Sequence, residues 1–340
     1  MNNLIEKPAY KLYNFHIKQL KCRWLMKNKK RNNKRKSLLI IGVIILIFIA
    51  FFFLFKDRIV QTKPFKAMDK KLGYKLTSKK IEIPDDVLAL SVYDINKGSY
   101  SLCEGEKQLP TVASLSKLFV IDYAMTKVNL NDSLEVTKDL LNLVPEGSSL
   151  AHLKTGKYSA KHIMQAMLVP SGNDAAYALA YNIGKIDLGA GYKAENYIDY
   201  FVDNLNKYLK HKGYKNTQLF DPSGFSTQAY TNLKDVNRVT LKLLDYDFVK
   251  ECIEESYFTV KTRQGIYSWK NTNEFLDKDS IYYNKNIKGV KTGTMASSYN
   301  LIALYEKNGK SYLITCLAAH TNNGRYKAVK TAIDKVIENN

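Results

Sequence analysis

Strand patterns lie near both ends of the part of this chain that looks foldable, and helical patterns lie between them. Alternating or short apolar runs predict strands at 87–94, 99–103, 289–293, 299–305 and 311–319. Helical spacing predicts helices at 160–167, 174–183 and 195–211, and a final amphipathic helix at 325–337. One antiparallel sheet must therefore be assembled from both chain ends. The sequence predicts an α+β fold, with helices covering this sheet and an inserted helical lobe forming one wall of a cleft.

Three short motifs occur in a fixed order along this pattern: Ser114-Leu-Ser-Lys117, Ser171-Gly-Asn173 and Lys291-Thr-Gly293. Ser114 is the only serine with a lysine three residues later, and both lie in an apolar stretch with helical spacing. Residues at i and i+3 share one helix face, so the two side chains are expected to meet. This pairing indicates a serine acyl-transfer site with lysine as its base.

Two of the motifs have second copies, Lys154-Thr-Gly156 and Ser298-Tyr-Asn300. Order and local pattern decide between the copies. The stretch at 154–156 is predicted to be a polar surface turn with no strand to present it. The Ser171 motif precedes a helical pattern, where the alternative interpretation is an ordinary helix cap.

The residues of the first and third motifs have distinct predicted roles in acyl transfer. Ser114 is the predicted nucleophile and Lys117 its base, with burial and the charge of Lys291 lowering the lysine pKa. Backbone N–H groups of Ser114 and Thr294 are the predicted oxyanion donors, and Gly293 lets substrate lie close to the strand.

The remaining candidates bind substrate or move protons. Lys291 and Thr292 are expected to bind a substrate carboxylate. Ser171 is expected to relay a proton to the leaving amine, and Asn173 to hold the substrate amide. His152, His162, His211 and His320 lack metal-ligand spacing, so neither a metal nor a cofactor is expected.

A long apolar segment precedes the domain. Residues 37–55 carry no charge and are long enough, at about 1.5 Å per residue, to cross a bilayer core. The segment runs into Lys56-Asp57-Arg58 without a small-residue cleavage site, which favours an uncleaved signal anchor over a cleaved signal peptide or a buried helix. Residues 1–36 hold twelve Lys and Arg against one Glu, which places them in the cytoplasm. This basic tail suits anionic lipid heads better than nucleic acid.

These patterns divide the chain into a basic cytoplasmic tail at 1–36, a transmembrane anchor at 37–55, a Lys-rich extracellular linker at 56–86 and a catalytic domain at 87–340. The protein is therefore expected to be a single-pass protein of the cell membrane. Cys103, Cys252 and Cys316 would lie outside the membrane. Their odd count and irregular spacing argue against a disulfide framework, and a single bridge between two of them stays open.

The motifs and their surroundings resemble a known family. The resemblance covers roughly Val87 to Asp334 and is strongest in the stretches 113–117, 167–176 and 288–294, with further similarity at 213–225 and 271–273. The chain is similar to serine-type D-alanyl-D-alanine carboxypeptidases, the low-molecular-mass penicillin-binding proteins of the β-lactamase/DD-peptidase superfamily. The resemblance implies that the chain removes the terminal D-alanine from peptidoglycan stem peptides and that β-lactams inhibit it.

The chain departs from the family pattern in two ways. Members commonly carry a further β-domain and a C-terminal amphipathic anchor, so the resemblance implies that anchoring has moved to the N-terminus here. Asp221 and Phe225 stand where the related segment more often has Asn and Leu.

Three other functions are compatible with the same motif residues. A class A β-lactamase would carry a Glu-x-x-Leu-Asn stretch after the middle motif, whereas Glu195, the only glutamate between Asn173 and Glu251, begins a helical pattern. A DD-endopeptidase or transpeptidase acting on cross-links would use the same residues with a different acceptor. A catalytically silent wall-binding module is the third.

Overall fold

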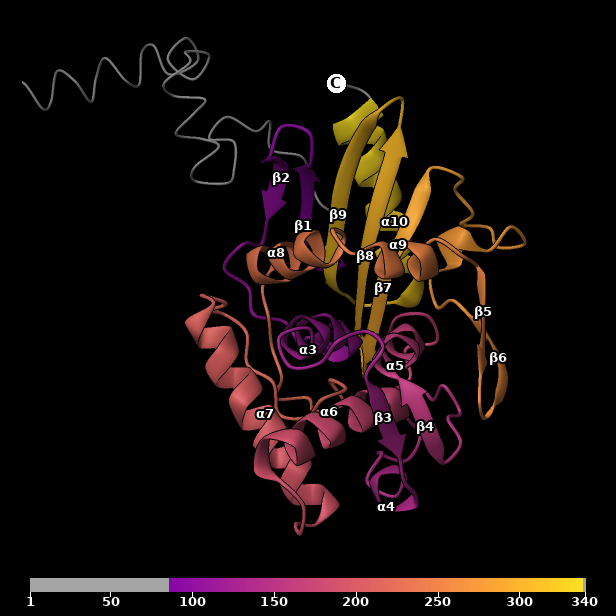
Figure 1. The fold of residues 1–340 in the computed structure, drawn as a ribbon. Helices are drawn as coiled ribbons and strands as arrows, with labels where there is room; N and C mark the ends of the chain where they lie inside the picture. The colour runs from indigo at the N-terminus through magenta and orange to yellow at the C-terminus, as the bar shows by residue number, and fades with distance from the viewer. Residues whose placement is uncertain (1–85, 339–340) are drawn as a thin grey trace, which may run out of the picture. The chain divides into compact units, whose positions relative to one another are not determined.

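The computed structural model describes residues 86–338, and its centre is a five-stranded antiparallel sheet with the order β2-β1-β9-β8-β7 (Figure 1). The strands are β1 (Val87–Asp94), β2 (Ser99–Glu104), β7 (Ile287–Met295), β8 (Ser298–Lys307) and β9 (Lys310–Ala319). Val87 of β1 pairs with Ala319 of β9, so the first strand lies against the last. The predicted sheet built from both chain ends is confirmed.

Side-chain alternation in the strands places a core on each face of the sheet. Leu90 and Val92 of β1 belong to a buried cluster with Tyr326 of α10 (Asn322–Ala332). Ser91 points to the opposite face, where its hydroxyl accepts a hydrogen bond from Asn237. Successive side chains of β1 therefore point to opposite faces of the sheet. One face makes apolar contacts with α10, and the other makes a polar contact with α8 (Leu233–Leu243).

The helical lobe surrounds α3 (Ser116–Ala124), all of whose residues are buried. The other helices on this side are α5 (Ala160–Leu168), α6 (Asn173–Leu188), α7 (Ala194–His211) and α9 (Asp247–Ile253). α6 and α7 approach closely at Gly184, where an added Cβ would lie 2.1 Å from the Tyr197 carbonyl oxygen. A helix that is apolar on every side must be covered on every side, which explains the central position of α3 in Figure 1.

Several short elements were not predicted from the sequence. They are the paired strands β3 (Ser133–Val136) and β4 (Gly156–Ser159), the hairpin β5 (Tyr257–Thr262) with β6 (Gly265–Lys270), the helix α4 (Lys138–Leu141) and the turn η2 (Glu274–Leu276). The predicted final helix at 325–337 is instead α10 followed by a π-helical segment, η3 (Ile333–Glu338).

The predicted tail, anchor and most of the linker lie outside the described residues. Within residues 86–338, no helix is long and apolar enough to span a bilayer. Cys103, Cys252 and Cys316 are free thiols, and burial raises the pKa of each to about 12.

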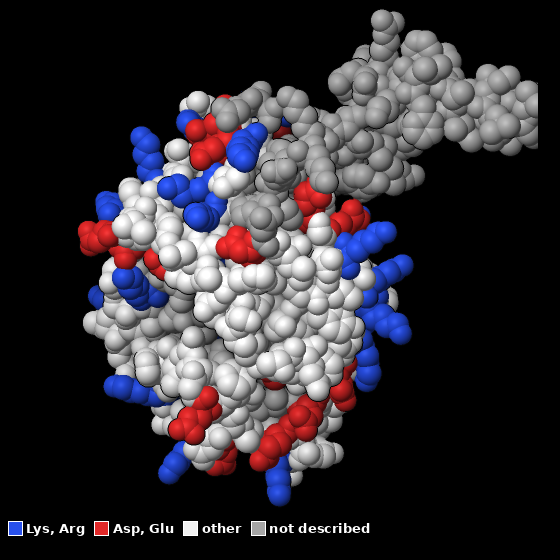
Figure 2. All heavy atoms as spheres, turned by 180° about the vertical axis from the view of Figure 1, so that it is seen from behind, with Lys and Arg blue, Asp and Glu red and all other residues white. Residues whose placement is uncertain are grey.

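Charge is dispersed on the face of the domain seen in Figure 2. Lysines and arginines lie in several separate groups there, with acidic residues among them and a wide uncharged area between. This face does not present the continuous basic surface that nucleic-acid binding commonly uses.

Candidate active site

The serine of the first motif lies in a tight turn that leads into the central helix. Ala113–Leu115 form the 3-10 turn η1, which continues directly into α3. The φ of Ala113 is 49°, so the backbone is strained immediately before Ser114. The expectation that Ser114 lies in the α-helix itself is therefore wrong. Ser114 lies in the 3-10 turn just ahead of α3 and is half-buried.

Lys117 joins three separate parts of the chain through its side-chain nitrogen. Its Nζ lies 2.9 Å from Ser114 Oγ, 2.7 Å from Asn173 Oδ1 and 2.9 Å from the carbonyl oxygen of Ser223. The whole residue is inaccessible to solvent. The predicted proximity of Ser114 and Lys117 is confirmed, and Asn173 and Ser223 are the other two partners.

The chemistry of these three partners fixes the direction of the hydrogen bonds once Lys117 is neutral. A carbonyl oxygen and an amide oxygen can only accept, so Asn173 and Ser223 take both N–H bonds of a neutral amine. The nitrogen lone pair then faces Ser114, whose hydroxyl is the only partner able to donate. Neutral Lys117 is thus placed to accept the proton of Ser114.

Burial makes this neutral state accessible near neutral pH. Desolvation lowers the pKa of Lys117 to about 7, although the carboxylates of Asp221 and Asp174 act in the opposite direction. Lys291 is also fully buried, and its pKa is well below the ordinary value because of burial and then because of the positive charges of Lys117 and Arg325. Two buried amines beside each other cannot both hold a proton easily.

The second motif lies where α5 ends and α6 begins. Asn173 is the first residue of α6, and its backbone N–H donates to the carbonyl oxygen of Ser149 over 2.8 Å. A Cβ on Gly172 would lie 2.7 Å from the Cβ of Ala151, so this close approach requires glycine. Ser171 is buried with a φ of 63°. Of these residues, Asn173 hydrogen-bonds directly to Lys117.

The third motif lies on β7, which runs beside the turn of Ser114. A Cβ built on Gly293 would lie 3.3 Å from the backbone nitrogen of Ser114, so glycine allows the strand and the turn to approach. Lys291 Nζ donates to the carbonyl oxygen of Thr292 over 3.0 Å, and the Thr292 hydroxyl shares a 2.6 Å hydrogen bond with Thr272. Thr294, the next residue of β7 after Gly293, is exposed.

A buried arginine at this end of β7 was missed from the sequence. Arg325 of α10 donates through Nη1 to the carbonyl oxygen of Gly293 and to the hydroxyl of Thr294, over 3.4 and 3.3 Å. The same nitrogen donates to the carbonyl oxygen of Asn300 over 3.1 Å. Arg325 thus places a permanent cation beside the third motif. Nothing in its local sequence distinguishes it from an ordinary helix arginine.

The second copies of two motifs, at 298–300 and 154–156, lie in other structural environments than the motifs themselves. Asn300 is buried in β8 and donates to the carbonyl oxygens of Thr111 and Val112, which hold the segment before η1 against the sheet. Lys154 and Thr155 are exposed, whereas Lys291 and Thr292 are buried. The expectation that no strand presents the earlier copy is wrong, because Gly156 begins β4 and pairs with Val136 of β3.

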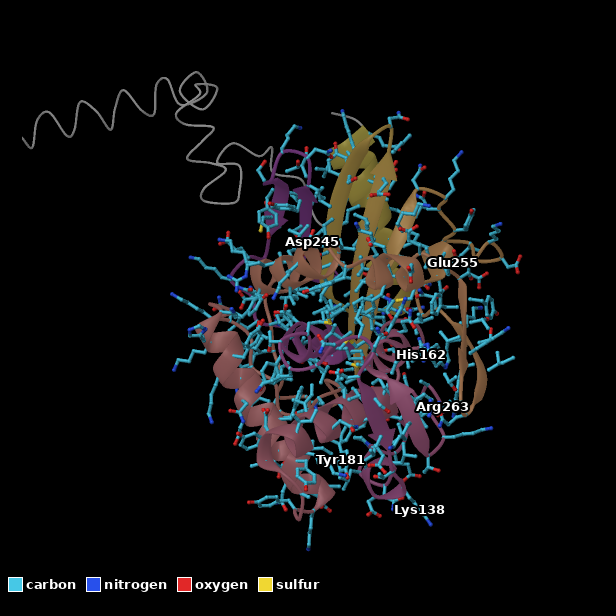
Figure 3. All side chains as sticks on the ribbon, viewed as in Figure 1. Lys138, His162, Tyr181, Asp245, Glu255 and Arg263 are labelled. Carbon is cyan, nitrogen blue, oxygen red and sulfur yellow. The ribbon has the colours of Figure 1, made fainter. Side chains whose placement is uncertain are left out.

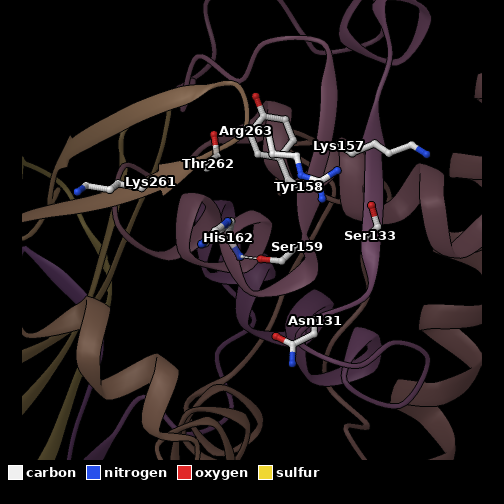
Figure 4. A pocket seen from close by; sticks show the side chains of 9 residues that line it. All are labelled: Asn131, Ser133, Lys157, Tyr158, Ser159, His162, Lys261, Thr262 and Arg263. Atoms are coloured by element: carbon white, nitrogen blue, oxygen red, sulfur yellow. Dashed lines mark hydrogen bonds between the residues drawn. The ribbon is translucent and has the colours of Figure 1, made fainter.

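A cavity of about 470 Å³ lies away from these motifs, between β3–β4, α5 and the β5–β6 hairpin. Its lining includes His162 and Arg263, which Figure 3 shows at neighbouring positions near the hairpin. Lys157 and Lys261 also line it, but their side chains extend in opposite directions in Figure 4. None of the candidate catalytic residues lines this cavity.

The sequence was compared with known families. A model of the D-alanyl-D-alanine carboxypeptidase family, Peptidase S11, matches residues 90–321. The chain belongs to this family of serine-type peptidases. A D-alanyl-D-alanine carboxypeptidase of Streptomyces sp. (strain K15) is 26% identical over 249 residues, which are 68% of this chain and 81% of the relative. D-alanyl-D-alanine carboxypeptidase DacF of Bacillus subtilis is also 26% identical, and the match spans 71% of this chain but only 59% of that protein.

Solved structures support the same fold. The Streptomyces K15 DD-transpeptidase superposes with a TM-score of 0.64 at 22% identity, covering 76% of this chain and 98% of that one. The family resemblance and the DD-peptidase fold expected from the sequence are both confirmed.

Proposed function

We propose that this protein is a membrane-anchored serine D-alanyl-D-alanine carboxypeptidase that acts outside the cytoplasmic membrane on peptidoglycan stem peptides. The observation that carries the proposal is the contact of Lys117 Nζ with Ser114, Asn173 and the Ser223 carbonyl. This arrangement supplies a serine hydroxyl with a buried base, which acyl transfer requires.

In the first half-reaction, neutral Lys117 removes the proton of Ser114 while Oγ attacks the carbonyl carbon between the two D-alanines. The tetrahedral intermediate collapses as the C–N bond breaks. The departing D-alanine amine takes the proton from Lys117, directly or through the Ser171 hydroxyl. An ester between Ser114 and the shortened peptide remains.

Stabilising the oxyanion is assigned to backbone N–H groups of Ser114 and Thr294. The close approach of Gly293 to the Ser114 nitrogen supports this assignment, because it brings β7 alongside the turn. Arg325 supplies the positive charge at this end of the site, beside the donors Lys291 and Thr292, and this arrangement suits the terminal carboxylate of the substrate. Asn173 both accepts from Lys117 and is placed to hold the substrate amide.

In the second half-reaction, water attacks the ester and Lys117 accepts a proton from it. Ser114 recovers its proton as the C–O bond breaks, which releases the shortened peptide. A β-lactam would acylate Ser114 in the same way, since its strained amide presents an equivalent carbonyl. A DD-endopeptidase or transpeptidase would share the acylation step and differ in the substrate or acceptor.

The decisive experiment supplies the full chain with a stem pentapeptide and measures free D-alanine, alongside the Ser114→Ala variant. We expect release by the wild type only. Release that survives the substitution, or no release at all, would refute the proposal. A cross-linked muropeptide dimer in parallel tests the endopeptidase alternative, and fluorescent penicillin followed by mass spectrometry tests acylation at Ser114. A long-lived adduct favours a penicillin-binding protein, and rapid turnover favours a β-lactamase.

A further inference from the structure

The carboxylate of Asp221 organises the loop that presents the Ser223 carbonyl oxygen to Lys117. Asp221 Oδ1 accepts hydrogen bonds from the backbone of Ser223, Gly224 and Phe225 over 2.8, 2.8 and 3.1 Å. It also accepts from the Ser223 hydroxyl over 2.6 Å, and Oδ2 accepts from the Ser226 backbone over 2.7 Å. Residues 221–226 are therefore folded around a single side chain, and we call them the Asp221 loop.

The Asp221 loop is packed directly against the catalytic turn. Gly224 has a φ of 78°, and a Cβ there would lie 1.9 Å from the Ala113 carbonyl oxygen and 2.5 Å from Ser116 Oγ. No larger residue fits this position without moving the turn. The loop cannot shift without disturbing the segment that carries Ser114.

Among residues 86–338, the carbonyl oxygen that the loop presents is one of two groups bonded to Lys117 that can only accept a hydrogen bond. Ser223 O lies 2.9 Å from Nζ, and Asn173 Oδ1 is the other acceptor. If Ser223 O moved away, a neutral Lys117 would have an N–H without a partner and its lone pair would no longer be held toward Ser114. Orientation of the base therefore depends on this loop.

We propose that Asp221 is a positioning residue for acyl transfer, which holds the Ser223 carbonyl against Lys117 and supplies the negative charge that balances this buried amine. The proposal rests on the proposed function, because it assigns Lys117 the role of base. Asn, the residue that the related segment more often has at this position, would keep the acceptor Oδ1, but it carries no charge and its NH₂ would face the N–H of Ser226. Loss of the charge should shift the pH profile of acylation, whereas loss of the loop contact should lower its plateau.

The other charges around Lys117 define the expected sign. Asp174 at the start of α6 is the second carboxylate near it, and Lys291 on β7 is a neighbouring buried amine whose own pKa is lowered by burial and then by Lys117. Tyr177 of α6 is buried, and its pKa is raised first by this burial and then by the charge of Asp221. Removing the charge of Asp221 leaves Asp174 alone to oppose the burial that lowers the pKa of Lys117, so Lys117 loses its proton more easily and becomes active at lower pH.

The test uses the full chain with Asp221→Asn, Asp221→Glu and the control Asp94→Asn. Asp94 is also buried and accepts a backbone N–H from Lys97, but it lies at the β1–β2 turn. For each variant we would measure penicillin acylation and D-alanine release as a function of pH. We expect Asp221→Asn to move the ascending limb of both profiles by about one pH unit toward acid and to lower the plateau about tenfold.

The comparison variants separate positioning from general loss of stability. Asp221→Glu keeps the charge but lengthens the side chain, so its limb should stay at the wild-type pH while its plateau falls. Asp94→Asn should leave both unchanged. An unmoved limb in a folded Asp221→Asn variant would overturn the proposal. If that variant does not fold, a wild-type plateau for Asp221→Glu would overturn it instead.

Failure of the proposed function gives a different result. A wild type that penicillin acylates but that releases no D-alanine contradicts the carboxypeptidase assignment, and a shifted acylation limb in Asp221→Asn would still support the positioning role. A wild type inert toward both substrates would refute both proposals.

Discussion

Lys117 Nζ lies 2.7 Å from Asn173 Oδ1, and this contact joins the first turn of α3 to the first residue of α6. The two residues are far apart in sequence, and both are buried. Because the amide oxygen can only accept, it fixes one N–H of the lysine and leaves the serine side of Nζ free for proton transfer.

Acylation should increase with pH through about 7, because burial lowers the pKa of Lys117 to about that value and only its neutral form can remove the Ser114 proton. Lys117→Ala should reduce acylation by about 10³-fold. The measurement is the rate of fluorescent penicillin labelling across neutral pH. A flat profile in the wild type would contradict the assignment of Lys117 as base.

Asn173→Ala should slow acylation about tenfold or more, because Lys117 loses one of its two pure acceptors. Asn173→Asp places a negative charge beside Nζ, which raises the lysine pKa, so the ascending limb should move to higher pH. The pH profiles of both variants check this. A limb that moves to lower pH in Asn173→Asp would show that the contact does not survive in solution.

Gly293→Ala should lower acylation about tenfold, because the new methyl would meet the Ser114 backbone at 3.3 Å and push β7 away from the turn. The melting temperature should change little, since the strand keeps its hydrogen bonds. Lys288→Ala on the same strand is the control and should keep the wild-type rate. Equal rates for the two variants would argue against the predicted oxyanion site.

Asn237→Ala should destabilise the domain without changing its chemistry. The Asn237 side chain donates to Ser91 and Tyr100 and accepts from Thr315, all in a buried position between α8 and the sheet. Its removal leaves these groups unpaired, at a cost of about 2–4 kcal/mol in the free energy of unfolding. Denaturant unfolding measures this, with the exposed Asn131→Ala expected within about 0.5 kcal/mol of wild type.

Removing residues 1–55 should transfer the protein from the membrane fraction to the soluble fraction, because residues 37–55 are the proposed anchor. Replacing basic residues of the tail with glutamine should leave it in the membrane. Cell fractionation and blotting measure both outcomes. A full chain found in the soluble fraction would refute the anchor.

The parts of the site that local sequence determines were predictable. Ser114 and Lys117 are three residues apart, so their contact depends on one turn of backbone. The strands of the large sheet carry long apolar patterns because both of its faces are covered. Gly293 was predicted to let substrate lie close to the strand, whereas its role in letting β7 approach the turn is seen only in the structure.

Other features depend on tertiary contacts that leave no local pattern. The Ser223 carbonyl is a backbone group, so its residue type carries no signal of the contact with Lys117. The sequence distinguishes Asp221 only as an unusual residue for its segment, whereas in the structure five hydrogen bonds converge on it. The β5–β6 hairpin has exposed residues on both faces, which removes the alternation that predicts strands.

The pairing of β1 with β9 has a consequence for the order in which the chain can fold. Val87 finds its partner Ala319 only after nearly the whole domain is available, and this is a contact of high sequence separation. The Ser114 turn is likewise completed by β7 and by Asn300 of β8, both from the late part of the chain. A nascent or truncated chain that lacks these strands would carry the serine and its lysine without the surroundings that make them reactive, so enzymatic competence comes last in biosynthesis.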